Sequence, residues 1–315
     1  MDCYLKGVYK ILFVDSPQIT VEEFGFLTGY TVSRAWIDKS VAKSFDLPVI
    51  YPSWYPDTEY FIEIFSQLRM ERFSNFEDYV GCLDRQLARG PVLTPIDRYF
   101  IDYISPRRHM GAHYILIHEY TKEGVCFFDP YDDEYHLLST EMLKEATSPS
   151  EKSVQHEGWM VIYRDDSNDI GDRAVSLLDC VQQRILRCRE TLSNLEEFKS
   201  KNISPVSRLA IKIAYQGILQ SDFYRANGYK ENEVFYRNHR IVCSAFLARM
   251  LARYYRAIAS IYGWFYVKRF PVTSIHWRSF LILYRLGLKI ELADYLLIYG
   301  LIWLGIKTDK RYYWE

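Results

Sequence analysis

The spacing of hydrophobic positions changes repeatedly in the first half of the chain, which predicts short helices among short strands. Within Asn75–Arg89, apolar residues recur every three or four positions, as in a helix with one buried face. The other expected helices are Cys3–Val14, Thr20–Phe26 and Thr140–Ala146, and the expected strands are Leu47–Tyr51, Pro91–Pro95, Tyr114–Tyr120, Gly124–Asp129 and Trp159–Tyr163. Asp2 and Ser74 are the expected N-caps. The pattern predicts an α+β fold in which a small antiparallel sheet carries the first helix.

The second half has a helical pattern almost throughout. The polar stretch Asp165–Asp172 is the best linker candidate, so we expect one domain at residues 1–165 and an all-helical domain at 172–315. Its expected helices are Arg173–Lys199, Pro205–Gln220, Glu231–Tyr262, Ser274–Leu286 and Glu291–Ile306. Tyr295–Ile306 is the longest apolar run near the C-terminus, and it is shorter than the roughly 20 residues that a bilayer requires. We therefore expect a buried helix and no membrane partner.

Charge is distributed unevenly along the chain although the net charge is −1. Residues 1–165 hold 16 basic and 26 acidic residues, and residues 166–315 hold 23 and 14. The two halves could attract each other, or the basic half could bind an acidic partner. With net charge near zero and no nucleic-acid-binding motif, we expect no nucleic-acid partner.

The six cysteines form no C-x-x-C pair. The first residues are neither basic nor long enough for a secretory segment, so reduced thiols and a cytoplasmic location are expected.

Cys3, His113 and Asp129 form a candidate site for nucleophilic catalysis. Cys3 begins a predicted helix, where free backbone N–H groups favour a thiolate and could hold an oxyanion. His113 precedes one predicted strand and Asp129 ends the next, so the two should lie side by side on adjacent antiparallel strands. They are expected to act as nucleophile, base and orienting carboxylate. The alternatives are an incidental cysteine, a core histidine and a turn-forming aspartate before Pro130.

Other residues near His113 suggest a pocket. Asp97, Tyr99, Tyr103 and Gly111 are expected to line it, although the same loop could simply cover the edge of the sheet. A metal site is the other candidate at this position, because ligand-type side chains cluster there, namely His109, His113, His118, Asp132, Asp133 and His136. No helix aligns the histidines and no cysteine pair accompanies them, so no metal site is expected.

The pattern G-P-V…D-x-Y-F…Y…H-M-G-A-H-Y-I-L…F-F-D-P-Y, together with Asp2-Cys3, resembles the N-terminal domain of the butirosin-biosynthesis acyltransferase family. That family is related to the papain-like peptidases of bacteriocin exporters. The resemblance covers about residues 1–150 and implies a papain-like cysteine-protease-type lobe. It also implies a triad of Cys3, His113 and Asp129 that moves an acyl group from an acyl carrier protein thioester to an amine. In this chain, bulkier Tyr4 and Leu5 replace the small residue that is common after the cysteine.

A carrier partner gives the basic helical half a possible purpose. Arg249, Arg253 and Arg256 share one face of a predicted helix and could hold an acidic carrier or its phosphopantetheine arm. A solvated face or pairing with the acidic half is the alternative. The resulting prediction is an acyltransferase in natural-product biosynthesis, acting through a Cys3 thioester on an acyl or peptidyl carrier protein and a small-molecule acceptor, with no bound cofactor. Thioesterase, peptidase, amidase or cyclase activity with the same triad, and a catalytically inactive binding module, remain alternatives.

Overall fold

A computed structural model describes residues 3–13, 19–29, 61–62, 65, 67–104, 112–148, 158–165, 175–199, 229–267, 274–305 and 311–312. The chain divides into two compact units. The first comprises Met1–Val21 and Thr58–Gly171, and the second comprises Glu22–Asp57 and Asp172–Glu315. Glu22–Asp57 thus groups with the helical part, whereas the sequence analysis assigned it to the first domain.

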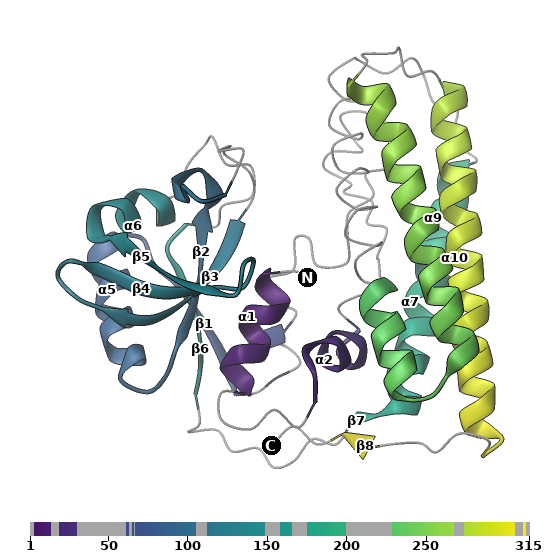
Figure 1. The fold of residues 1–315 in the computed structure, drawn as a ribbon, viewed down its shortest axis with the longest axis horizontal. Helices are drawn as coiled ribbons and strands as arrows, with labels where there is room; N and C mark the ends of the chain where they lie inside the picture. The colour runs from purple at the N-terminus through teal and green to yellow at the C-terminus, as the bar shows by residue number, and fades with distance from the viewer. Residues whose placement is uncertain are drawn as a thin grey trace. The chain divides into compact units, whose positions relative to one another are not determined.

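The first unit is built on an antiparallel sheet (Figure 1). Among the described residues, the strand order is β1-β6-β2-β3-β4-β5, and each recorded pairing is antiparallel. The strands are β1 (Leu68–Arg72), β2 (Val92–Asp97), β3 (Ala112–Tyr120), β4 (Gly124–Asp129), β5 (Glu134–Ser139) and β6 (Met160–Arg164). β3 and β4, which carry His113 and Asp129, are neighbours, so the topology brings these two residues together.

Helices cover both faces of this sheet. α5 (Phe76–Leu87) and α6 (Thr140–Thr147) bury apolar residues with alternate residues of β2, β3 and β4 in one core. α1 (Cys3–Leu12) packs against β2, β3 and β6. Leu93 of β2 contacts α1, whereas the preceding residue, Val92, belongs to the core beneath α5 and α6. Because successive residues of a strand point to opposite faces of a sheet, α1 lies on the face opposite to α5 and α6. A 3-10 turn, η1 (Arg98–Phe100), follows β2.

The second unit consists mainly of helices: α2 (Val21–Leu27), α7 (Leu177–Lys199), a helix at 229–238, α9 (Val242–Val267) and α10 (Ser274–Trp303). A short strand pair joins β7 (Val175–Ser176) to β8 (Arg311–Tyr312). Fully buried Arg184 donates to the Phe26 carbonyl and to Tyr295, and Tyr295 donates to Glu291. These bonds satisfy a charge that would otherwise be costly to bury.

The α+β class and the small antiparallel sheet are confirmed, but several elements differ from the predictions. The N-cap of α5 is Asn75 rather than Ser74, because the Asn75 side chain accepts the N–H of Asp78. β1 and β5 were not predicted. The predicted helix Glu231–Tyr262 is interrupted at Arg240, whose φ of 55° is incompatible with a continuing helix. The predicted helices Ser274–Leu286 and Glu291–Ile306 instead form the single helix α10.

Some predictions fall on parts of the chain that are not described, namely the strand Leu47–Tyr51, the helix Pro205–Gln220 and the Asp2 cap. None of the helices in the described ranges combines the length and the hydropathy needed to cross a membrane.

Candidate active site

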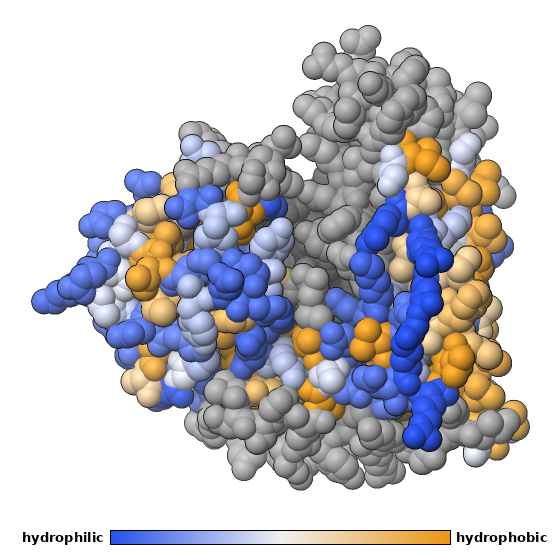
Figure 2. Space-filling view, viewed as in Figure 1, coloured by the Kyte–Doolittle hydropathy of each residue, from blue (hydrophilic) through white to orange (hydrophobic). Residues whose placement is uncertain are grey.

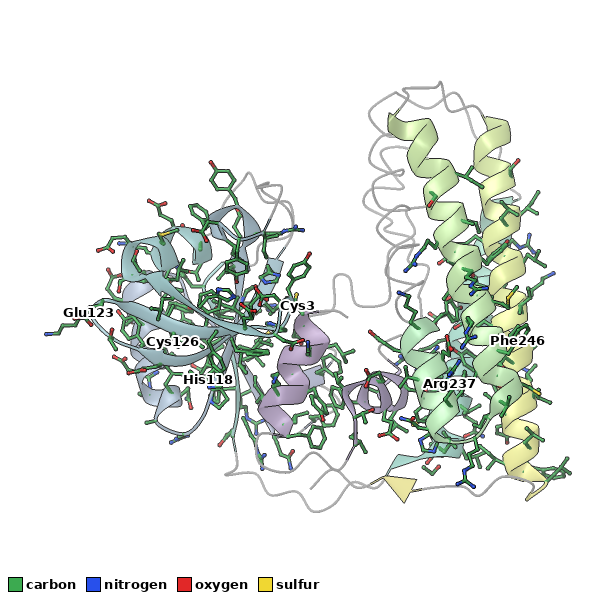
Figure 3. All side chains as sticks on the ribbon, in the orientation of Figure 1. Cys3, His118, Glu123, Cys126, Arg237 and Phe246 are labelled. Atoms are coloured by element: carbon green, nitrogen blue, oxygen red, sulfur yellow. The ribbon has the colours of Figure 1, made fainter. Side chains whose placement is uncertain are left out.

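The position of Cys3 is set by the packing of α1 on the sheet. Tyr4, the next residue, places its ring 4.6 Å from that of Tyr114, which follows His113. Gly7 allows close approach, because a Cβ there would clash with Cδ1 of buried Leu93. The backbone N–H of Tyr114 donates to Cys3 Sγ at 3.4 Å. Cys3 therefore lies at the start of α1, beside the beginning of β3 (Figure 3).

A second set of contacts ties α1 to the turn that follows β4. The Lys6 ammonium donates to the Pro130 carbonyl at 3.2 Å and forms an ion pair with Asp133. At the other end of the helix, Arg164 of β6 donates to the Leu12 carbonyl. The cysteine helix and the hairpin that carries Asp129 are thus joined directly.

His113 and Asp129 form a close buried pair. His113 Nε2 lies 2.9 Å from each carboxylate oxygen of Asp129. The pairing of Leu116 with Phe128 puts Asp129 opposite Ile115, so Asp129 is the diagonal neighbour of His113 across the two strands. Since Asp129 occupies Nε2, Nδ1 is the ring nitrogen that remains for an interaction with Cys3, whose charge acts on His113.

The electrostatic surroundings favour the charged forms of His113 and Asp129. Burial alone would lower the pKa of His113, but the charge and hydrogen bond of Cys3 and those of Asp129 outweigh it and raise the pKa to about 10. Burial also opposes ionisation of Asp129, yet the bonds from His113, Tyr103 and the Tyr131 N–H hold its pKa below the usual value. The His113–Asp129 pair is therefore an imidazolium beside a carboxylate at neutral pH.

The predicted pocket residues differ in what they contact. Asp97 is buried and accepts the Tyr99 N–H at the start of η1, and the Tyr99 ring packs edge-on against Phe100. Tyr103 donates its hydroxyl to Asp129 Oδ2 at 2.6 Å. Gly111 lies outside the described residues.

The arginines proposed for carrier docking also differ from one another. Arg249 donates to Glu233 through Nε at 2.9 Å and a terminal nitrogen at 2.6 Å, so it pairs within the helical half rather than with the acidic half. Arg253 and Arg256 are exposed on α9. Figure 2 shows a hydrophilic band in this region of the second unit.

The remaining cysteines have environments that differ from that of Cys3. Cys82, Cys180 and Cys188 are buried, and Cys126 is half-buried in β4, away from Cys3 (Figure 3). Cys243 is exposed near the start of α9.

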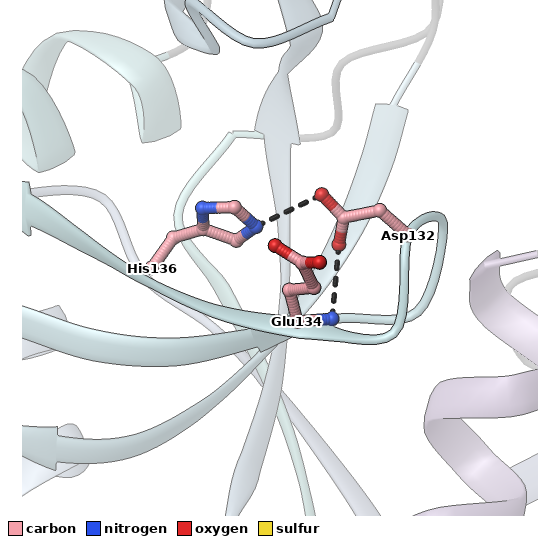
Figure 4. Close-up of side chains that lie close together, drawn as sticks. All are labelled: Asp132, Glu134 and His136. Carbon is pink, nitrogen blue, oxygen red and sulfur yellow. Dashed lines mark hydrogen bonds and ion pairs between the residues drawn. The ribbon is translucent and has the colours of Figure 1, made fainter.

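Within the part of the chain that the structure describes, the residues that could hold a metal ion are Asp132, Glu134 and His136, whose ligand atoms lie within 4.8 Å of one another (Figure 4). They are not the set considered from the sequence, because His113 binds Asp129 and the His118 ring packs against Tyr135. Glu134 was missed, although the alternation Asp132, Glu134, His136 could have indicated it. His136 Nε2 bonds Asp132 at 2.9 Å, and this bond orients the ring.

Comparison with known protein families and with characterised proteins finds no match for this chain.

Proposed function

We propose that this chain is a cysteine-dependent acyltransferase with Cys3 as nucleophile, His113 as acid and base, and Asp129 as the residue that orients His113. The observation that carries the proposal is the arrangement of three side chains: Cys3 acts on His113, and His113 is hydrogen-bonded to Asp129. Cys3 lies at the start of α1, beside His113, and the thiolate is the form that attacks carbonyl carbon.

In the first half-reaction, the Cys3 thiolate attacks the carbonyl carbon of a thioester. A new sulfur–carbon bond forms, the bond to the departing thiol breaks, and the imidazolium proton of His113 passes to that thiol. In the second, an amine attacks the Cys3 thioester, its proton moves to His113, and the Cys3 thiolate is released. Asp129 holds the ring nitrogen away from Cys3 in its N–H form throughout.

Oxyanion stabilisation is assigned to backbone groups near Cys3. α1 begins at Cys3, and the first N–H groups of a helix lack partners within it. Such groups can stabilise the negative charge of a tetrahedral intermediate.

The donor and acceptor are proposed from the resemblance to the butirosin-biosynthesis acyltransferases. On that basis the fold of the first unit is papain-like, the donor is a phosphopantetheine-linked acyl group on a carrier protein, and the acceptor is a small-molecule amine in natural-product biosynthesis. The proposed location is the cytoplasm.

The test is turnover of an acyl-carrier thioester with a panel of amines, with the products identified by mass spectrometry. Cys3→Ala and His113→Ala should each lose nearly all turnover while remaining folded. Asp129→Asn should retain more activity than either, because it changes the orientation of His113 without removing nucleophile or base. Release of free acid with every acceptor would instead identify a hydrolase, and full activity of His113→Ala would exclude the proposed site.

A further inference from the structure

The Asp129 carboxylate is held by more than His113. It is completely buried, and each oxygen accepts one additional bond. Oδ2 accepts the Tyr103 hydroxyl at 2.6 Å, and Oδ1 accepts the Tyr131 backbone N–H at 2.7 Å. Since His113 Nε2 is equidistant from the two oxygens, its bond alone leaves the plane of the carboxylate poorly defined. The Tyr103 and Tyr131 bonds define that plane.

The Tyr103 ring is itself fixed by the β4–β5 hairpin. It stacks on the His136 ring with centroids 3.8 Å apart and planes inclined by 12°. His136 is held on its other sides by the bond to Asp132 and by the Phe127 ring, whose centroid lies 5.7 Å away. The hydroxyl of Tyr103 is therefore directed at Asp129 from a ring with a fixed position, although the side chain is partly exposed.

We propose that Tyr103 is a positioning residue that acts through Asp129 on His113, and that His136, held by Asp132, keeps the Tyr103 ring in place. Tyr103 is one of the expected pocket residues, and its hydroxyl donates to a carboxylate. A hydrogen bond to a charged acceptor is stronger than one between neutral groups. The consequence of this arrangement for catalysis rests on the proposed function.

The electrostatics agree with this role. Burial and the charge of Asp129 raise the pKa of Tyr103 far above its usual value, so the hydroxyl stays a donor at every physiological pH. Asp102 and Asp132 also face the hydroxyl and act in the same direction. Among the described residues, the titratable side chains that face the His113–Asp129 pair are Cys3 from α1, Tyr103, and Tyr131, whose ring packs edge-on against His113.

The decisive variant is Tyr103→Phe, which keeps the stacked ring and removes only the hydroxyl. The Tyr103 bond is one cause of the lowered pKa of Asp129, so its loss should raise that pKa. In the full-length protein, carbon NMR of the Asp129 carboxyl should report the rise. In turnover assays, the acid limb of kcat/KM should move to higher pH, and kcat should fall about tenfold with little change in KM.

Tyr135→Phe is the matched control, because Tyr135 is an exposed tyrosine of β5 that packs against Phe128 and His118. It should leave the Asp129 titration unchanged. His136→Ala should shift the titration in the same direction as Tyr103→Phe, and His136→Phe should restore most of the wild-type behaviour because it keeps a ring for stacking.

Two outcomes would overturn the proposal: an Asp129 titration that does not change in Tyr103→Phe, or an increased KM with unchanged kcat and acid limb, which would indicate substrate contact. The NMR measurement needs no substrate. An inactive wild-type protein in which the Asp129 titration still shifts would therefore reject the proposed function and leave the hydrogen-bond network intact.

Discussion

At the residue scale, the account depends on a thiol whose reactivity comes from its neighbours rather than from its exposure. Cys243 is more exposed than Cys3, but Cys3 is the cysteine that acts on buried His113 and raises its pKa. Exposure and activation by a neighbour therefore predict different patterns of chemical modification.

Iodoacetamide at near-neutral pH should modify Cys3 in the native protein at least about tenfold faster than Cys243, because the thiolate is the reactive form. Peptide mapping after brief exposure gives the rates. In His113→Ala the preference should disappear. Faster modification of another cysteine in the wild type would exclude Cys3 as the nucleophile.

The titration of His113 should depend on Cys3. Among the causes that raise the pKa of His113 to about 10, the charge of Cys3 comes first, so Cys3→Ala should lower that pKa. Proton NMR of the ring then shows an imidazolium through pH 8 in the wild type and loss of the proton at lower pH in the variant. His118, whose pKa is lowered by burial and by Lys10, serves as the internal control. An unchanged His113 titration would mean that the two side chains do not interact.

The three main site residues could be predicted from the sequence because each marks the start or end of an element. Cys3 begins α1, His113 lies near the start of β3, and Asp129 ends β4. The proposed role of Tyr103 could not be predicted, because it depends on stacking against His136, which lies 33 positions further along the chain. No local pattern indicates such a contact.

At the element scale, the sheet illustrates what periodicity can and cannot predict. β4 has a strong apolar signal, whereas β5 exposes Leu137 and Tyr135 and lacks a clean alternation of apolar and polar residues. α10 continues through Gly287, where the absence of a side chain accommodates the Tyr255 ring of α9. Glu291, where the sequence predicted the start of a separate helix, is buried within α10 and accepts the Tyr229 and Tyr295 hydroxyls. Tertiary packing decides all three cases.

Gly7 should be important for placing α1. Gly7→Ala inserts a methyl group against Leu93 in a buried contact, at a cost of about 1–3 kcal/mol that exceeds the roughly 1 kcal/mol gained in helix propensity. We expect a lower free energy of unfolding in urea and slower alkylation of Cys3, and partial recovery when Leu93→Val is added.

Gly81→Ala on α5 is the control for this substitution, since the new methyl group would meet only Arg85 at an ordinary 3.7 Å. It should stabilise the protein by up to about 1 kcal/mol through helix propensity alone. Equal effects of the two substitutions would show that the contact with Leu93 does not position the helix.

At the scale of the whole molecule, the first half of the chain is acidic and the second half is basic. Exposed arginines of α9, in the basic half, could therefore bind an acidic partner. If Arg253 and Arg256 bind a carrier protein, changing both to Glu should raise KM for a carrier-bound substrate and leave turnover of a short pantetheine thioester unchanged. The effect should weaken with salt, since exposed charges are screened over about 10 Å at 0.1 M. Changing exposed Arg85 and Arg89 of the first unit to Glu is the control. Equal losses with both substrates would indicate a structural role.

The central claim is that acyl transfer proceeds through a covalent thioester on Cys3. Intact-mass spectrometry after brief incubation with acyl-pantetheine thioesters, without an acceptor, tests it most directly. The account predicts a mass gain of one acyl group, located on Cys3 by peptide mapping, absent in Cys3→Ala and discharged when a suitable amine is added. Acylation of a different residue, or undiminished product formation by Cys3→Ala, would contradict the account.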